Sequence, residues 1–140
     1  MQMKREVSIL ILITVLLVAP AIHALTPGPN TYVIHEVYVF KLNGEITDLT
    51  YEELQNALQL AESTPNSTLL ILFETPGGEL DAALSIVSSI ENASVPVIGF
   101  VYPVGSYAWS AGTLVLISTT IAAMAPSTVI GSCQPVEINP

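Results

Sequence analysis

The sequence predicts one α/β domain in which repeated β-α-β units build a mostly parallel sheet. Short runs of β-branched and other apolar residues alternate with stretches whose apolar residues recur at helical spacing. Glycines and prolines that favour turns separate these segments. The length of 140 residues suits a single domain. Alternation of this kind is typical of a parallel sheet with helices packed on it.

The first 24 residues predict a targeting segment. Lys4 and Arg5 precede an apolar run over residues 7–19, Pro20 ends the run, and small residues follow up to Ala24. This order is typical of a secretory signal peptide. We therefore expect residues 1–24 to be a signal peptide or, if uncleaved, a signal anchor in the membrane. Residues 25–31 are then a linker, residues 32–140 form the domain, and the domain lies outside the cytoplasm, secreted or membrane-anchored.

The first β-α-β unit is predicted between residues 32 and 73. Residues 32–42 are rich in strand-forming side chains, and Asn43-Gly44 predicts a turn. Thr50 and Glu53 have the spacing of a capping box at a helix start. A helix is then expected to about Ser63, and its apolar face consists of Tyr51, Leu54, Leu58 and Ala61. The continuous apolar run over residues 68–73 predicts a strand buried on both faces.

Further units follow along the chain. A sharp turn is predicted at residues 75–78, and a helix from about Leu80 to Ile90. The expected apolar face of that helix consists of Leu80, Ala83, Leu84, Val87 and Ile90. Residues 97–101 predict a strand, residues 103–105 a turn, and the segment that begins at Ser110 a helix. Residues 121–124 and 129–130 predict short strand or turn pieces.

Composition excludes several classes of partner. The net charge is −9, and the sequence after Ala24 holds one lysine, no arginine and eleven acidic residues. Such a surface repels phosphate backbones and anionic headgroups, so we expect no nucleic-acid partner and no polybasic membrane patch. Cys133 is the only cysteine, which excludes an intramolecular disulfide and a multi-cysteine metal site. We expect it in the core, and we expect no metal and no cofactor. Asn66 and Asn92 begin glycosylation sequons whose occupancy stays open.

Two turns between a strand and a helix hold groups suited to catalysis. In parallel sheets, functional residues gather at the carboxyl ends of the strands. Gly77 and Gly78 leave backbone N–H groups bare, which suits either a simple tight turn or a site for a developing oxyanion. Ser110 stands before a helix among small residues. It is either a helix N-cap or a nucleophile followed by a second oxyanion donor, the amide of Ala111.

Together, the two turns resemble the ClpP-class serine peptidases of the ClpP/crotonase superfamily, in particular the membrane-bound NfeD-type proteases. FETPGGELDAALSIVSSI resembles the Pro-Gly-Gly segment, and VYPVGSYAWSAGTLVLISTTIAAMAPSTVIGSCQPV resembles the nucleophile segment. Residues 123–126 and 130–131 have the Ala-Met-Ala-Pro and Ile-Gly sequences typical of NfeD-type proteases. The resemblance spans about Val39 to Val136. It implies a ClpP/crotonase-like fold, Ser110 as the catalytic serine, and Gly77, Gly78 and Ala111 as the oxyanion hole.

The same resemblance implies a function. It predicts a serine endopeptidase that cleaves apolar segments of stomatin-like membrane proteins. The expected partners are a polypeptide substrate and further copies of the chain in a homo-oligomer. Trp109 departs from the family, which usually has a small residue there, so the indole either narrows the pocket or forms an apolar subsite. Ser106 is a rival nucleophile, but its position does not match the family serine.

The catalytic base that the resemblance requires is missing from the sequence. NfeD-type proteases pair the serine with a downstream lysine and ClpP uses a downstream histidine and acid, whereas no Lys, Arg or His follows Lys41 here. Lys41 and His35 lie in or near the first strand, where neither group of enzymes places its base. We therefore expect a domain truncated at its C-terminus and nearly inactive alone.

Three explanations for the missing base stay open. The chain is a piece of a longer or split product, or it is a non-catalytic ClpP-like peptide-binding or scaffold subunit, or another subunit supplies the base. A crotonase-type acyl-CoA enzyme is disfavoured, because the domain has almost no basic residues to hold the CoA phosphates.

Overall fold

The structure, a computed structural model, describes residues 33–133. The predicted leader and linker, and residues 134–140, lie outside this range. In chain order the elements are β1 (Glu36–Asn43), α2 (Asp48–Glu62), β2 (Ser67–Glu74), α3 (Leu80–Glu91), β3 (Val97–Val101), β4 (Tyr107–Trp109), α4 (Ala111–Ile117), β5 (Ile121–Met124) and β6 (Val129–Gly131). Within residues 33–133, no helix is long and apolar enough to cross a membrane.

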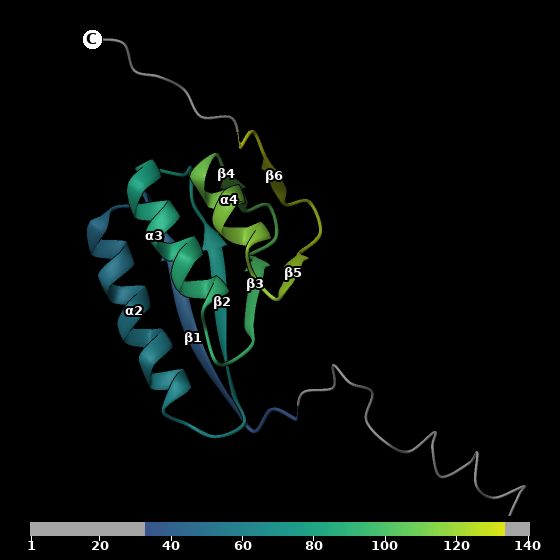
Figure 1. The fold of residues 1–140 in the computed structure, drawn as a ribbon. Coiled ribbons are helices and arrows are strands. Elements are labelled where there is room, and N and C mark those ends of the chain that lie inside the picture. Colours follow the sequence, from purple (N-terminus) through teal and green to yellow (C-terminus); the bar gives the residue numbers. More distant parts are fainter. Residues whose placement is uncertain (1–32, 134–140) are drawn as a thin grey trace, which may run out of the picture. The chain divides into compact units, whose positions relative to one another are not determined.

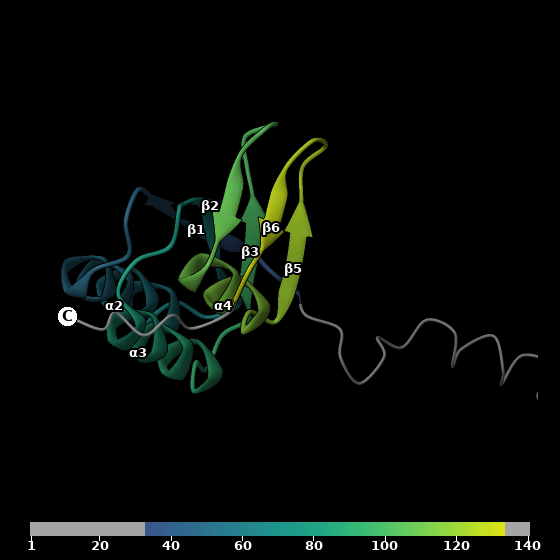
Figure 2. The same cartoon turned by 90° about the horizontal axis from the view of Figure 1, so that it is seen from above.

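Four strands form a parallel sheet in the order β1-β2-β3-β5. The register places Leu42 beside Phe73, and Phe73 beside Val101. Helices α2, α3 and α4 all lie on one side of this sheet (Figures 1 and 2). The α/β class, the parallel sheet and the order of its elements are as the sequence predicts.

Strands β4 and β6 form a second, two-stranded parallel sheet. Tyr107 lies opposite Val129, and Trp109 lies opposite Gly131. This small sheet lies beyond the carboxyl ends of β2 and β3, next to α4 (Figure 1). The sequence predicts only a loop over β4, because three residues are too few to show an alternating pattern.

The hydrophobic core fills the space between the helices and the sheet. Leu54 and Leu58 of α2 and Ile71 and Phe73 of β2 are fully or almost fully buried in it. Cys133, expected in this core, is instead exposed, because it follows β6 at the surface.

The buried face of α3 differs from the predicted one. Its buried residues are Ala82, Ala83, Ile86 and Ile90, whereas Leu80 and Leu84 are exposed. Apolar residues occur around most of this helix, so two overlapping stripes fit helical spacing. The packed stripe is the one that holds two alanines, whose small side chains allow neighbouring elements to come close.

The N-terminus of α2 also differs from the prediction. The N-cap is Thr47, and its partner in the capping box is Thr50 rather than Glu53. The Thr50 amide donates to the Thr47 hydroxyl at 3.4 Å, and the Thr47 amide donates to the Thr50 hydroxyl at 3.2 Å. The helix therefore begins one turn earlier than predicted, and Asp48 lies in its first turn, where a negative charge is favourable.

The sheet face opposite the helices is only partly covered within residues 33–133. Leu70 and Leu72 of β2 are half-buried on this face, and Val39 of β1 is 55% exposed. The prediction that β2 is buried on both faces is therefore wrong for the described part of the chain. The reason is that all three helices pack on the other face.

Candidate active site

Thr75 joins the glycine turn to the strand that precedes Ser110. It follows β2 directly and is fully buried. Its N–H donates to the Tyr107 carbonyl at 2.9 Å, and its carbonyl accepts from the Trp109 N–H at 3.0 Å. Gly78 and Ser110 are 32 residues apart in the sequence, and this pair of bonds holds their segments side by side in the fold.

Gly77 packs directly against Ser110. Its φ is +99°, which an L side chain rarely adopts. A Cβ at this position would lie 2.8 Å from the Ser110 Cβ and 2.8 Å from the Trp109 carbonyl oxygen. Its N–H donates to the Thr75 hydroxyl at 3.1 Å. Only glycine fits this contact, and its amide is already engaged.

Gly78 is held by buried Ile46. The Ile46 N–H donates to the Gly77 carbonyl at 2.9 Å, and the Glu79 N–H donates to the Ile46 carbonyl at 2.9 Å. A Cβ on Gly78 would lie 2.2 Å from the Ile46 carbonyl oxygen. The Gly78 N–H itself makes no hydrogen bond with any residue between 33 and 133. It is therefore free to bind a ligand.

Ser110 occupies a strained turn between β4 and α4. Its φ is 49° and its ψ is −120°, a region that non-glycine residues adopt only where the surrounding structure enforces it. The residue is exposed, and its side chain makes no capping hydrogen bond to the helix. The alternative of a capping serine is therefore not supported. A serine on a sharp strand-to-helix turn is also the arrangement of the nucleophile elbow in other hydrolases.

Two groups lie around Ser110. Ala111 is the first residue of α4, where a backbone N–H has no partner inside the helix. A Cβ on Gly77 would lie 3.1 Å from the Ala111 nitrogen, so the turn and this amide are adjacent. On the other side, the Ser110 N–H donates to the Gly131 carbonyl at 3.2 Å. The structure thus brings Ser110, Gly77 and Ala111 into one place, with Gly78 next in the turn.

Thr113 fixes the segment that follows β5 to the serine turn. Its buried hydroxyl donates to the Ala108 carbonyl at 2.6 Å and accepts from the Gly131 N–H at 3.0 Å. Because Gly131 also accepts from Ser110, this single hydroxyl connects β4, α4 and β6. Sequence reasoning misses Thr113 and Thr75, since a lone threonine carries no spacing signal.

Ser106, the rival nucleophile, is a structural residue. It is 3% exposed, and its hydroxyl is directed to the Phe73 carbonyl at 3.4 Å. A buried hydroxyl that donates to the backbone cannot reach a substrate peptide. Ser110 is the exposed serine of this loop.

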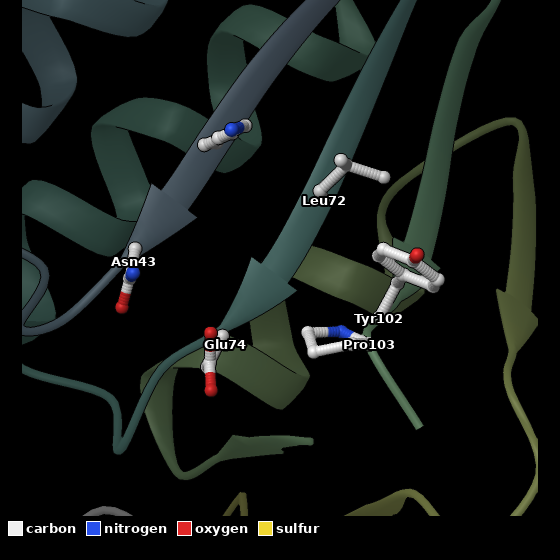
Figure 3. A pocket seen from close by; sticks show the side chains of 6 residues that line it. Asn43, Leu72, Glu74, Tyr102 and Pro103 are labelled. Atoms are coloured by element: carbon white, nitrogen blue, oxygen red, sulfur yellow. The ribbon is translucent and has the colours of Figure 1, made fainter. Parts of the chain in front are cut away.

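The two candidate bases lie elsewhere. His35 precedes β1, at the opposite end of that strand from the glycine turn. Lys41 is on the partly covered face of β1, in a hollow of about 170 Å³ lined also by Asn43, Leu72, Glu74, Tyr102 and Pro103. In Figure 3 the labelled side chains of this hollow are in view, and the helices lie behind the sheet. Within residues 33–133, no hydrogen bond connects Lys41 or His35 to Ser110.

Comparison with known families identifies the relationship. Residues 36–139 match the family described as NfeD1b, N-terminal domain. The chain belongs to this family. A membrane-bound protease of Pyrococcus horikoshii is 41% identical over 100 residues, which are 71% of this chain and 23% of that protein.

Solved structures agree with the family assignment. A serine-to-alanine variant of a membrane-bound stomatin-specific protease matches 76% of this chain and 50% of its own, with a TM-score of 0.69 and 39% identity. A lysine-to-alanine variant in complex with a substrate peptide matches 74% and 47%, with a TM-score of 0.69 and 40% identity. ClpP1 of Listeria monocytogenes, 22% identical with a TM-score of 0.61 over 66% of this chain and 54% of its own, shows the ClpP-like fold. This NfeD1b chain spans about half the length of these structures.

Proposed function

We propose that this NfeD1b chain carries the nucleophile and the oxyanion-binding groups of a membrane-associated serine endopeptidase, with Ser110 as the nucleophile. The observation that carries the proposal is the exposed Ser110 side chain. It lies in a strained turn, makes no capping hydrogen bond to the helix, and packs against Gly77. Similarity to a membrane-bound protease and to a stomatin-specific protease supports it.

The proposed chemistry follows from the backbone around Ser110. The Ser110 Oγ attacks the carbonyl carbon of the scissile bond, and the carbonyl oxygen becomes an oxyanion. The N–H groups of Gly78 and Ala111 donate to it, and each such donor is worth about 3–4 kcal/mol in other enzymes. The C–N bond then breaks, the amine leaves with a proton, and water hydrolyses the acyl-enzyme. Gly77 has a positioning role here, since its amide binds Thr75.

A proton acceptor must activate the serine. Lys41 and His35 are the lysine and histidine of residues 33–133, and both lie away from Ser110 as described above. We infer that the acceptor belongs to a residue outside this range, in the same chain or in a partner.

The proposed substrate is an apolar polypeptide segment of a stomatin-like membrane protein. The similar structures are described as specific for stomatin or a stomatin homolog, and one of them contains a substrate peptide. The net charge of −9 disfavours acidic peptides, because the summed field of the protein repels them.

We also propose that the protein is extracytoplasmic and acts as a homo-oligomer.

Cleavage of an apolar stomatin-type peptide by the full-length protein tests this function. Ser110→Ala should lower kcat/KM by at least about 1,000-fold, while Ser106→Ala, if it folds, and Lys41→Gln should change it by less than about threefold. Full activity in Ser110→Ala would show that the nucleophile is misassigned. Loss of activity in a Lys41→Gln variant that still folds would show that the proton acceptor is misassigned. Saturable peptide binding without cleavage would favour the non-catalytic peptide-binding alternative.

A further inference from the structure

Trp109, the residue before Ser110, presents its indole at the surface. Its side chain is 45% exposed, and its ring stacks on the ring of Tyr107 at 4.4 Å between centroids and 28° between planes. Tyr107 and Trp109 are two residues apart in β4 and so share one face of that strand. We name these two stacked rings the aromatic pair.

Within residues 33–133, the contact between β4 and the hydrophobic core does not involve the Trp109 indole. Ala108, which points to the other face of the strand, is fully buried and makes the contact with the core. Gly131 lies opposite Trp109 in β6, so the residue directly across from the indole has no side chain. The stacking nevertheless fixes the ring, so binding to it costs little conformational entropy.

The position of the aromatic pair decides what it binds. Adjacent Cα atoms are about 3.8 Å apart, and an extended peptide advances about 3.3–3.6 Å per residue. A peptide whose carbonyl group lies at Ser110 therefore has side chains near Trp109 within about three residues of the scissile bond. A large, flat, uncharged surface favours an apolar side chain, and the acidic Glu79 after the glycine turn disfavours a carboxylate.

We propose that the aromatic pair is a subsite for an apolar side chain of the polypeptide bound at Ser110, and that Trp109 sets the preference for that side chain. The proposal rests on the proposed function for the identity of Ser110. It extends that function by naming the residue that contacts an apolar side chain of the substrate and selects for it.

Intrinsic fluorescence tests the subsite without requiring catalysis, because Trp109 is the only tryptophan of the 140 residues. The Ser110→Ala form of this chain is titrated with a short leucine-rich peptide and with a matched peptide in which glutamate replaces each leucine. We expect a saturable blue shift with the leucine peptide and none with the glutamate peptide. Calorimetric binding of the leucine peptide with no change in emission would overturn the proposal.

Substitution separates selection from structural support. In the full-length protein, Trp109→Ala should lower kcat/KM for the leucine peptide by about 10- to 100-fold and for an alanine peptide by less than about threefold. Trp109→Phe should keep most of the wild-type kcat/KM. Tyr102→Ala, which removes a half-exposed aromatic ring from the hollow that contains Lys41, should have no effect. An equal loss for both peptides would show that Trp109 only supports the serine turn. If nothing is cleaved but the blue shift occurs, the subsite stands and the proposed function fails.

Discussion

Gly78 lies in backbone contact with Ile46, and this contact aligns the turn beside Ser110. The Ile46 carbonyl oxygen would be 2.2 Å from a Cβ on Gly78, and Ile46 is completely buried. Neither backbone has room to move apart, because Ile46 is also held by hydrogen bonds to Gly77 and Glu79. The geometry of the proposed oxyanion site therefore depends on glycine at this position.

Gly78→Ala should consequently be strongly destabilising. We expect a loss of more than about 3 kcal/mol in the free energy of unfolding, because a methyl group is forced into fixed backbone. Gly105→Ala is the matched control, since Gly105 has a φ of +83° but nothing within 4 Å of its Cβ position. It should cost only the left-handed backbone penalty, about 1–2 kcal/mol. Urea unfolding measures both, and equal losses would contradict the contact described.

Which of the two glycines offers a free amide could not be predicted from the sequence. The motif predicts both Gly77 and Gly78 as oxyanion donors, and the two residues have no side chain to tell them apart. Thr75 and Ile46 make the difference through bonds to the turn, and Ile46 lies 32 residues before Gly78 in the sequence. Ser110 and Ala111 could be proposed as site residues from the sequence, because the small residues around them and the helix start that follows are local features.

Helix α2 is fixed at its start by the reciprocal bonds between Thr47 and Thr50. The sequence predicts an N-cap one turn later, since Thr-x-x-Glu is the commoner spacing signal. A threonine at the third position has the same function here, because its hydroxyl also reaches back to the N-cap amide. The existence of helix α2 was predictable from the spacing of its apolar residues. Its first residue depended on whether Thr47 or Thr50 is the N-cap.

Replacing the observed N-cap, Thr47, and the predicted capping-box partner, Glu53, distinguishes the two boundaries. Thr47→Ala should lower the free energy of unfolding by about 0.5–2 kcal/mol, because a helix amide loses its acceptor. Glu53→Ala, at an exposed position, should change it by no more than about 0.5 kcal/mol. Thermal unfolding followed by circular dichroism gives both values. The reverse order of effects would place the helix start at Thr50.

At the scale of the whole molecule, one face of the parallel sheet carries all three helices and the other is partly open within residues 33–133. The alternation of strands and helices made the α/β class and the parallel pairing predictable. How far the second face is covered was not predictable, because an apolar strand has the same sequence whether or not a partner packs on it. The β4–β6 sheet escaped prediction because pairing between its short strands depends on the turn at Thr75 and on the Thr113 hydroxyl.

The predicted leader, residues 1–24, allows the proposed export of this protein to be tested. A fusion of residues 1–31 to alkaline phosphatase should give an active enzyme, because that enzyme needs export to form its disulfides. The same fusion with Lys4 and Arg5 changed to glutamate should lose much of that activity. Activity confined to a cytoplasmic reporter would refute export.

Sedimentation of the full-length protein as a monomer would refute the proposed homo-oligomer.

The central claim is that Ser110 is a nucleophile presented beside the free amides of Gly78 and Ala111. Its most direct test is to treat the full-length protein with a fluorophosphonate and to locate the adduct by peptide mass spectrometry. The phosphonyl oxygen would occupy the position of the oxyanion and accept from both amides. The account predicts one adduct, on Ser110, that is absent in Ser110→Ala. An adduct on Ser106, or labelling undiminished in Ser110→Ala, would contradict it.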